Sequence, residues 1–342
     1  MKKWLRITFV SVLCLAFLAT TEKPATPAEA QRVELKVAAP HPKGHAALTG
    51  LNHLADLVKE RSKGGLEIKW AGGPELFKPR DLLEKTGAGI VDMFTGSLGY
   101  FIHLAPELGY EALPFDLTFA TIPKLTAEMT PIVDKILNKN GAKLVAAATY
   151  NLTFHFFTKK PVRKMEDLKG MTMRGHGFIP AKMIEALGAT AVVLPSAEVY
   201  TALERGVIDG AMYNWPSYME YMMYETGAIY VVDFVLSFGI GYAVGINLDR
   251  YQKLSPELQK ILLEAGRDTD KWSVDFWEKE QERLMREGKA KGVKVYTLPP
   301  DEAKRWRTTL VTRVKPSFLE LKGIDKEMAG KFVDLMEKKW EP

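Results

Sequence analysis

Apolar positions along the chain alternate between strand-like and helical spacing in a regular order. Residues 32–40 (RVELKVAAP) alternate toward an apolar end and predict a strand. In 41–65, apolar residues from Leu48 to Val58 recur at helical spacing before two glycines, which predicts a helix. Residues 66–70 (LEIKW) predict a second strand. This β-α-β order favours a right-handed crossover and a mainly parallel sheet.

The pattern restarts near residue 152. Strands are predicted at 153–159, 171–174, 189–195 and 207–214, with helices at 177–188 and 196–206 between them. Ser196 has the position and chemistry of an N-cap for the second of these helices. Strand-like runs at 228–238 and 241–248 follow. A helix start at Ser255-Pro256 then opens a helical pattern reaching about Glu287, too long for one compact domain.

These patterns predict an α/β protein of two lobes arranged as a clamshell, with crossing strands and a long late helix bridging the lobes. We expect lobe I to contain residues 31–151 plus about 240–279, and lobe II to contain 152–239 plus about 280–342. The last helix is apolar on one side, at Met328, Phe332, Leu335 and Met336. We expect that side to pack on its own lobe in a monomer, with exchange between the copies of a dimer as the alternative.

The first thirty residues have the layout of a cleaved secretory signal peptide. A basic start precedes a mostly apolar run from Leu5 to Ala19, and the small-residue site Ala28-Glu29-Ala30 precedes Gln31. The apolar run is short for a membrane anchor. The single cysteine, Cys14, lies inside this run, so we expect the mature chain to have neither disulfides nor thiol chemistry. Export by this route predicts a periplasmic protein.

Composition excludes several classes of function. Residues 1–30 carry four of the 47 basic and two of the 42 acidic residues, so the net charge falls from +5 to +3 without them. That balance argues against nucleic-acid binding. No phosphate-binding loop and no nucleophile elbow are present, and the only thiol lies in the apolar leader, which argues against an enzyme. His41 and His45 straddle a predicted turn without a matching carboxylate, so we predict no metal site and no cofactor.

Arg174 is the most informative polar residue. It ends the predicted strand MTMR and is followed by Gly175 and Gly177, where its planar fork could meet a carboxylate or a similar oxyanion between the lobes. Equally, it could form a structural salt bridge with Asp167 or another acid. Residue chemistry alone leaves both interpretations open.

The run FFTKKPVRKMEDLKGMTMRG, followed by IEALGATAVVLPSAEVYTALERGVIDGAMYN, resembles the periplasmic substrate-binding proteins of TRAP transporters, the DctP type. The motifs occur in the order typical of the family: a strand, then PV, DLKG, the arginine, ALGA, and the EVY and DG strings. Two further runs, ELFKPRDLLEKTGAGIVDM and ALPFDLT, are more weakly similar to the family. The resemblance implies a two-lobed receptor that closes around a small organic acid. Such a receptor delivers the acid to the small and large subunits of a membrane permease driven by an ion gradient.

The resemblance also assigns residues. The family's carboxylate-clamping arginine corresponds to Arg174, and its substrate-contacting asparagine to Asn214. Trp215 and Tyr150 end predicted strands, where ligands bind in open α/β sheets. The full set of predicted substrate-binding residues is Arg174, Asn214, Trp215, Tyr150, Phe154, His41, Glu75 and Tyr218.

Departures from the family pattern narrow the ligand. Sialic-acid-type members carry a second arginine where this chain has Phe154, so we expect one anionic anchor. Oxo-acid-type members resemble the NWPSY run, and some of them bind a cation through a glutamate where this chain has Asn214. A small carboxylate, whether 2-oxo, branched or aromatic, is the expected ligand. A sulfonate is the alternative ligand. The alternative functions are a sensor subunit and an enzyme on the same scaffold.

Overall fold

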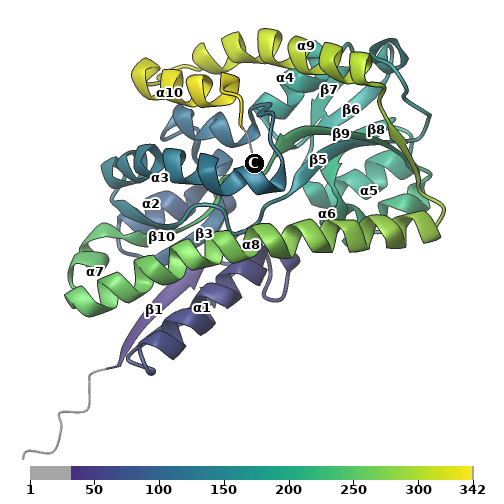
Figure 1. Ribbon diagram of the computed structural model, residues 1–342. Helices are drawn as coiled ribbons and strands as arrows, with labels where there is room; N and C mark the ends of the chain where they lie inside the picture. Colours follow the sequence, from purple (N-terminus) through teal and green to yellow (C-terminus); the bar gives the residue numbers. More distant parts are fainter. Residues whose placement is uncertain (1–31, 341–342) are drawn as a thin grey trace, which may run out of the picture.

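Two β-sheets organise the protein, whose computed structural model describes residues 32–340 (Figure 1). The first sheet has the strand order β2-β1-β3-β10-β4, and the second has β11-β9-β5-β8-β6-β7. The first contains β1 (Val33–Ala38), β2 (Leu66–Gly72), β3 (Met93–Ser97), β4 (Ala142–Ala146) and β10 (Tyr242–Asn247). The second contains β5 (Thr153–Thr158), β6 (Thr172–Gly175), β7 (Thr190–Val193), β8 (Gly210–Asn214), β9 (Tyr230–Phe238) and β11 (Lys294–Thr297).

Helices cover both sheets (Figure 1). They are α1 (Thr49–Arg61), α2 (Leu82–Gly87), α3 (Ile122–Lys139), α4 (Phe178–Ala186), α5 (Ser196–Glu204), α6 (Trp215–Glu220), α7 (Leu248–Gln252), α8 (Pro256–Ala290), α9 (Pro300–Leu319) and α10 (Lys326–Glu337). Three short 3₁₀ helices matter for the site, namely η1 (Ala46–Leu48), η3 (Leu98–Phe101) and η4 (Pro106–Ala112). The predicted α/β class with two sheets is confirmed. The predicted signal peptide lies outside the described residues.

Both sheets are mixed, whereas the sequence pattern predicted mainly parallel pairing. β1 pairs parallel with β2 and β3, as expected for a β-α-β unit, but β10 is antiparallel to β3 and β4. In the second sheet β5 is antiparallel to β8 and β9. The antiparallel pairs arise where the chain passes from one sheet to the other. There, a strand enters its sheet directly instead of returning through a helix.

The long helix α8 runs along both sheets, as predicted (Figure 1). Ser255 caps it by accepting a hydrogen bond from the N–H of Leu258 at 3.3 Å. Glycines bring it close to both halves of the molecule. A Cβ at Gly266 would lie 1.9 Å from the carbonyl oxygen of Val145, and one at Gly288 would lie 2.7 Å from the Trp215 ring.

Polar side chains of α8 bind the segment that crosses from β4 to β5. The Asp270 carboxylate accepts hydrogen bonds from the N–H groups of Ala147 and Ala148, at 3.0 and 2.8 Å. Further along, Gln281 Oε1 accepts from the N–H of Thr153 at 2.9 Å. The helix therefore holds the crossing at both of its ends, because β4 belongs to the first sheet and β5 to the second.

The terminal helix α10 packs within this chain. The apolar side predicted from the sequence is buried, and the ring of Phe332 stacks on Tyr110 of η4 with 4.2 Å between centroids. The N–H of Asp325, just before the helix, donates to Glu107 of the same η4. The last helix thus contacts elements that precede the second sheet in the chain. The exact lobe boundaries given above stay a prediction.

Candidate ligand-binding site

Arg174 lies at the end of β6, between β7 and β8, and its side chain is 3 % exposed. Nε donates to the carbonyl oxygen of Leu194 at 3.0 Å, and one terminal nitrogen donates to that of Met212 at 3.3 Å. The other terminal nitrogen donates to Ser196 Oγ at 3.4 Å. Ser196 is the first residue of α5 and not its N-cap, which is Pro195, so the predicted capping role is wrong.

The buried charge of Arg174 has no carboxylate partner within residues 32–340. The proposed structural partner, Asp167, instead accepts hydrogen bonds from the N–H groups of Arg163 and Lys164. Burial lowers the pKa of Arg174, and the face of the Tyr213 ring lies 5.1 Å from the guanidinium carbon. A guanidinium has five N–H donors, and the three bonds above leave two for an anion. The salt-bridge interpretation is therefore wrong.

Three buried tyrosine hydroxyls in this part of the molecule also lack a hydrogen-bond partner within residues 32–340. They belong to Tyr213 of β8, Tyr150 of the crossing segment and Tyr242 of β10. The rings of Tyr150 and Tyr242 meet edge to face with 5.4 Å between centroids. Since buried hydroxyls are normally bonded, three orphans beside an unpaired cation indicate polar groups that await a ligand.

Histidine rings complete this group of side chains. His41, which follows β1, stacks on His45 at 4.0 Å and faces Tyr242 at 6.2 Å. From the second sheet, the ring of Phe154 stacks on His176 at 4.6 Å. Burial lowers the pKa of His41 and of His176 to about 3, helped by His45 in the first case and by Arg174 in the second. Both rings are therefore neutral at pH 7 and add no second positive charge.

A polar contact between a histidine and a carboxylate joins the two halves of the molecule beside these rings. His45 Nε2 lies 3.4 Å from a carboxylate oxygen of Glu220, at the end of α6. His45 Nδ1 accepts from the N–H of Ala47, which leaves Nε2 as the nitrogen that carries hydrogen toward Glu220. The contact connects η1 of the first half to α6 of the second.

Glu111 of η4 places a carboxylate against the same tyrosines. Ser97 Oγ donates to its Oε1 at 2.5 Å. Burial raises the pKa of Glu111 to about 7, against the lowering effect of hydrogen bonds from Ser97 and from the N–H groups of Gly99 and Leu98. The pKa of Tyr100 in η3 depends on the charges of both Glu111 and Arg174. Burial raises its pKa to about 12, with Glu111 adding to the rise and Arg174 opposing it.

We use the name Arg174 cluster for Arg174, His176, Phe154, Tyr213, Tyr150, Tyr242, Tyr100, His41 and Glu111. Four predicted site residues belong to it, namely Arg174, Tyr150, Phe154 and His41. Asn214 ends β8 directly beside it and caps α6, because its Oδ1 accepts from the N–H of Ser217 at 2.9 Å.

The other predicted site residues lie elsewhere. Trp215 and Tyr218 are buried in the apolar core under α6, where the Tyr218 hydroxyl donates to the carbonyl oxygen of Ala228 at 2.9 Å. Glu75 is exposed, and its carboxylate accepts from the N–H of Gly73. An aromatic residue at a strand end was the signal for Trp215, but its side chain points into the core and not toward Arg174.

Sequence reasoning missed Tyr242, His176, Ser196 and Glu111 as site residues. His176 had a usable signal, since it lies two residues after Arg174 between glycines. Tyr242 and Glu111 had none. They join the Arg174 cluster only because β10 and η4 meet the second half of the molecule at the crossings.

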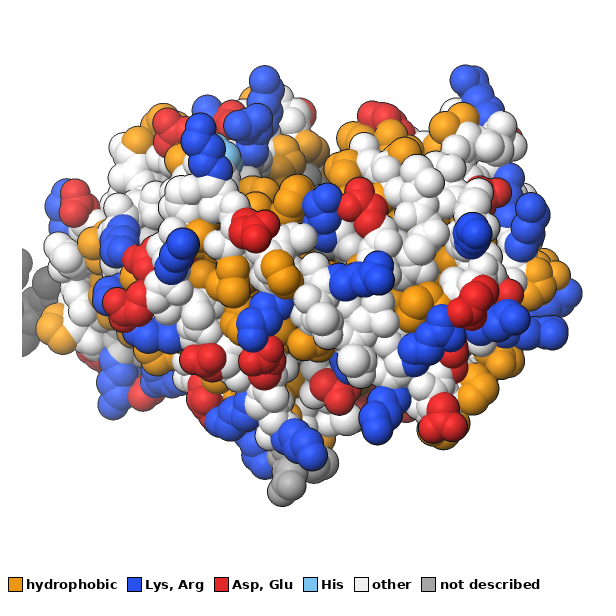
Figure 2. Space-filling model, turned by 90° about the horizontal axis from the view of Figure 1, so that it is seen from above, with side chains coloured by type: hydrophobic (Ala, Val, Ile, Leu, Met, Phe, Trp, Pro, Cys, Tyr) orange, Lys and Arg blue, Asp and Glu red, His pale blue; other side chains and the backbone are white. Residues whose placement is uncertain are grey.

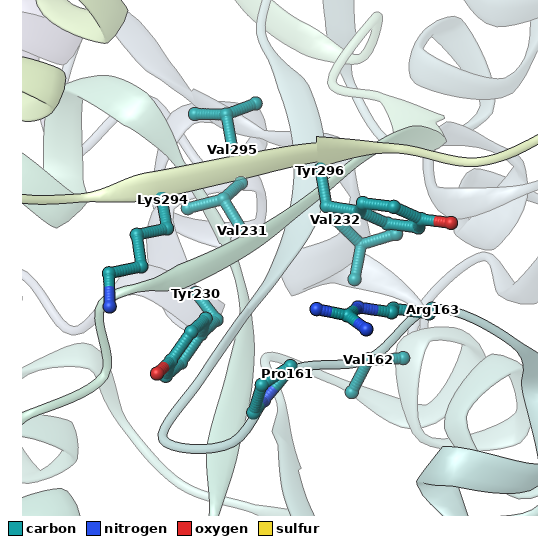
Figure 3. A pocket seen from close by; sticks show the side chains of 9 residues that line it. All are labelled: Pro161, Val162, Arg163, Tyr230, Val231, Val232, Lys294, Val295 and Tyr296. Carbon is teal, nitrogen blue, oxygen red and sulfur yellow. The ribbon is translucent and has the colours of Figure 1, made fainter.

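Other surface features do not coincide with the Arg174 cluster. A pocket of about 180 Å³ lies at the edge of the second sheet, between β9, β11 and the loop at 161–163 (Figure 3). None of the predicted site residues lines it. Acidic and basic side chains are interspersed on the face seen from above (Figure 2). In residues 32–340 no group of three or more metal-ligating side chains is positioned to hold a metal ion, and no helix there is long and apolar enough to cross a membrane.

Known proteins of similar sequence include a C4-dicarboxylate-binding protein, DctB, of Bacillus subtilis. It is 28% identical over 274 residues, which cover 79% of this chain and 76% of that protein. DctP7, a Bordetella pertussis extracytoplasmic solute receptor binding pyroglutamic acid, has a similar structure with a TM-score of 0.76 and 23% identity. The match covers 90% of this chain and all of that one.

A TRAP periplasmic solute-binding protein from Rhodoferax ferrireducens with bound malonate also shares the fold, with a TM-score of 0.75 and 22% identity over 89% of this chain and 97% of that one. The family model described as bacterial extracellular solute-binding protein, family 7, matches residues 37–320. The resemblance predicted from the DLKG and DG blocks is thereby confirmed. This chain belongs to family 7 of the bacterial extracellular solute-binding proteins, the DctP-type receptors of TRAP transporters.

Proposed function

We propose that this protein is a periplasmic receptor that captures a small monocarboxylic acid at Arg174 and delivers it to a TRAP membrane permease. The observation that carries the proposal is the buried guanidinium, which has two unused donors and no carboxylate partner among the described residues. A buried cation without its anion is costly, so the ligand carboxylate supplies the missing partner.

A single negative charge fits the Arg174 cluster better than two. His41 and His176 are neutral at pH 7 because their pKa values are about 3, and Phe154 occupies the place of a second arginine. A dicarboxylate would bring a second charge with no cation to meet it. The apolar faces of Phe154, Tyr150 and Tyr242 suit a short aliphatic, 2-oxo or aromatic remainder.

Membership of the family supports delivery to a membrane permease. We propose that residues 1–30 export the chain and are removed, and that the mature protein works as a monomer which releases its acid to the small and large permease subunits. Residues on both sheets meet around Arg174, so a ligand there contacts both halves only when they are together. Such contacts would stabilise a closed form, and catalytic turnover has no part in this cycle.

A thermal-shift screen of the chain without residues 1–30 tests the proposal. A ligand at one hundred times its dissociation constant should stabilise the protein by roughly 2.7 kcal/mol. We expect shifts with small monocarboxylates in the wild type and none in Arg174→Gln. Arg174→Lys serves as the matched control, because it keeps the charge but loses the fork, and it should retain weakened binding.

Sulfonates belong in the same screen, since one guanidinium fits either oxyanion. Shifts from sulfonates alone would replace the carboxylate assignment while keeping Arg174 as the anchor. Binding that survives in Arg174→Gln, or product formed from a bound acid, would overturn the proposal.

A further inference from the structure

Glu111 is a polar member of the Arg174 cluster that comes from the first half of the molecule, and two glycines lie close against its side chain. A Cβ at Gly99 would lie 2.3 Å from Glu111 Oε1, and a Cβ at Gly241 would lie 2.5 Å from its Cβ and 2.8 Å from Oε2. Any side chain at either glycine would displace the carboxylate. Together with the hydrogen bond from Ser97, the two glycines hold Glu111 in one position.

That position adjoins the ligand groups described above. Gly241 precedes Tyr242, whose buried hydroxyl lacks a partner. Burial is the main reason why the pKa of Tyr242 is raised, and Tyr100, Tyr150 and the Glu111 carboxylate each raise it further. Tyr100 in turn responds to the charges of both Glu111 and Arg174. Two residues before Gly241, a Cβ at Gly239 would lie 3.3 Å from the Phe154 ring, which stacks on His176. The segment from Gly239 to Tyr242 therefore joins the surroundings of Glu111, in the first half of the molecule, to the side chains beside Arg174 in the second.

The chemistry of the two groups is complementary. Arg174 can only donate hydrogen bonds, whereas an ionised Glu111 can only accept them and has about four acceptor sites on its two oxygens. Its bonds from Ser97 and the Gly99 N–H use part of that capacity. No lysine or arginine forms an ion pair with Glu111 in the part of the chain that the structure describes.

We propose that Glu111 is a specificity-determining residue that accepts a hydrogen bond from the ligand, so that the receptor selects carboxylic acids carrying a hydroxyl or N–H donor. This inference rests on the proposed function, because it assumes that Arg174 holds the ligand carboxylate. The donor reaches toward the first half of the molecule while the carboxylate faces the second. An acid without a donor leaves Glu111 and its neighbouring hydroxyls unpaired.

Calorimetric titration of one carbon skeleton in several substituted forms tests the inference. The series is pentanoic acid, its hydroxy derivatives at each position along the chain, 2-oxopentanoic acid, and the 2-amino and 5-amino acids. A hydrogen bond to a charged group should make the best donor-bearing acid bind about 10–100-fold more tightly than pentanoic acid. The hydroxy and amino members distinguish a hydroxyl donor from an ammonium donor.

Glu111→Gln provides the second arm, with Glu84→Gln on the exposed face of α2 as the matched control. We expect Glu111→Gln to bring the ratio between the best donor-bearing acid and pentanoic acid to within about threefold while pentanoic acid itself still binds. The control variant should keep the wild-type ratio.

Different failures have different meanings. If acids bind through Arg174 but no donor at any position improves affinity in the wild type, the inference about Glu111 is wrong and the proposed function stands. The inference is equally wrong if Glu111→Gln keeps the full ratio. If no acid in the series binds, or if binding ignores Arg174→Gln, the proposed function itself fails. The wild-type series remains decisive even if Glu111→Gln does not fold.

Discussion

Two arginines in this protein are largely removed from water, and their surroundings differ in one respect. Arg307 of α9 donates to the carbonyl oxygens of Pro114, Phe115 and Val235, and its Nε lies 3.5 Å from the Asp116 carboxylate. Arg174 has three hydrogen bonds, to two carbonyl oxygens and one hydroxyl, and no carboxylate partner in the described part of the chain. Burial lowers the pKa of both side chains, but only Arg307 has an acid that opposes the effect.

The difference separates a structural arginine from the one that we propose binds the ligand. Arg307 connects the segment after η4 to β9, and the chain itself supplies the groups that it needs. Around Arg174 the neighbours are unpaired too, since Tyr150, Tyr213 and Tyr242 have free hydroxyls. Burial of a charge is therefore uninformative by itself. The remaining donors and orphaned neighbours point to a ligand.

Replacing Arg174 gives the largest expected effect on binding. Arg174→Gln should weaken binding of the ligand acid by about 3 kcal/mol or more, which is about 100-fold or more. The free energy of unfolding of the ligand-free protein should change little or rise, because an unpaired buried charge is removed. Calorimetry and urea denaturation measure the two quantities. A large loss of stability without ligand would make Arg174 structural and remove the contrast.

Replacing Arg307 should give the reverse pattern. Arg307→Gln loses hydrogen bonds to buried carbonyl groups, so the free energy of unfolding should fall by about 1–3 kcal/mol. The exposed Asp116 contributes little to this loss because water screens the pair. Ligand affinity of the folded fraction should stay within about threefold of wild type. Urea denaturation of both arginine variants side by side is the measurement, and equal stability losses would contradict the comparison.

A second arginine tests whether Arg174 acts alone. Phe154→Arg places a guanidinium where the Phe154 ring now stacks on His176, next to Arg174. We expect dicarboxylates to gain about tenfold in affinity relative to monocarboxylates, since the second charge then has a partner. Phe154→Leu is the control without charge. A ligand profile identical to wild type would place Phe154 outside the binding site.

Buried carboxyl groups provide a smaller effect that depends on pH. The pKa of Asp270 is raised from 3.8 to about 7, mainly by burial, against the hydrogen bonds from Ala147 and Ala148. The folded protein therefore binds this proton more tightly than the unfolded chain. The stability that the group contributes is complete below about pH 4 and is lost as pH rises toward 7. The stability that Glu111 contributes is likewise lost as the pH rises from about 4.5 to 7.

His41 and His176 change the stability in the opposite direction. Because their pKa values are lowered in the folded protein, they favour the folded state as pH rises. The effect of Asp270 is therefore measured as the difference in the free energy of unfolding between Asp270→Asn and wild type. Between pH 4 and pH 7, the free energy of unfolding of Asp270→Asn should rise by on the order of 1–2 kcal/mol relative to that of wild type. Thermal unfolding at a series of pH values checks this, and a difference that does not vary with pH would show that Asp270 does not titrate in this range.

Much of the local structure could be predicted from the sequence. The start of α8 at Ser255-Pro256, the buried side of α10 and the strands around Arg174 agree with capping chemistry and apolar spacing. Ser196 is a residue for which local sequence rules predicted the wrong role. Its hydroxyl could cap a helix, yet it accepts a hydrogen bond from Arg174 instead, because the second sheet brings that side chain within 3.4 Å.

The sequence by itself determined the family and the α/β class, and it singled out Arg174 as the proposed anchor, since these depend on short motifs and on periodicity along the chain. Only the tertiary structure decided which side chains surround that arginine. Glu111, Tyr242 and Arg174 are separated by long stretches of chain, and only the crossings between the sheets bring them into one cluster. Trp215 and Glu75 had suitable positions in the sequence, but their side chains point into the core and to the surface. Side-chain direction at a strand end depends on packing between elements, which spacing along the chain does not record.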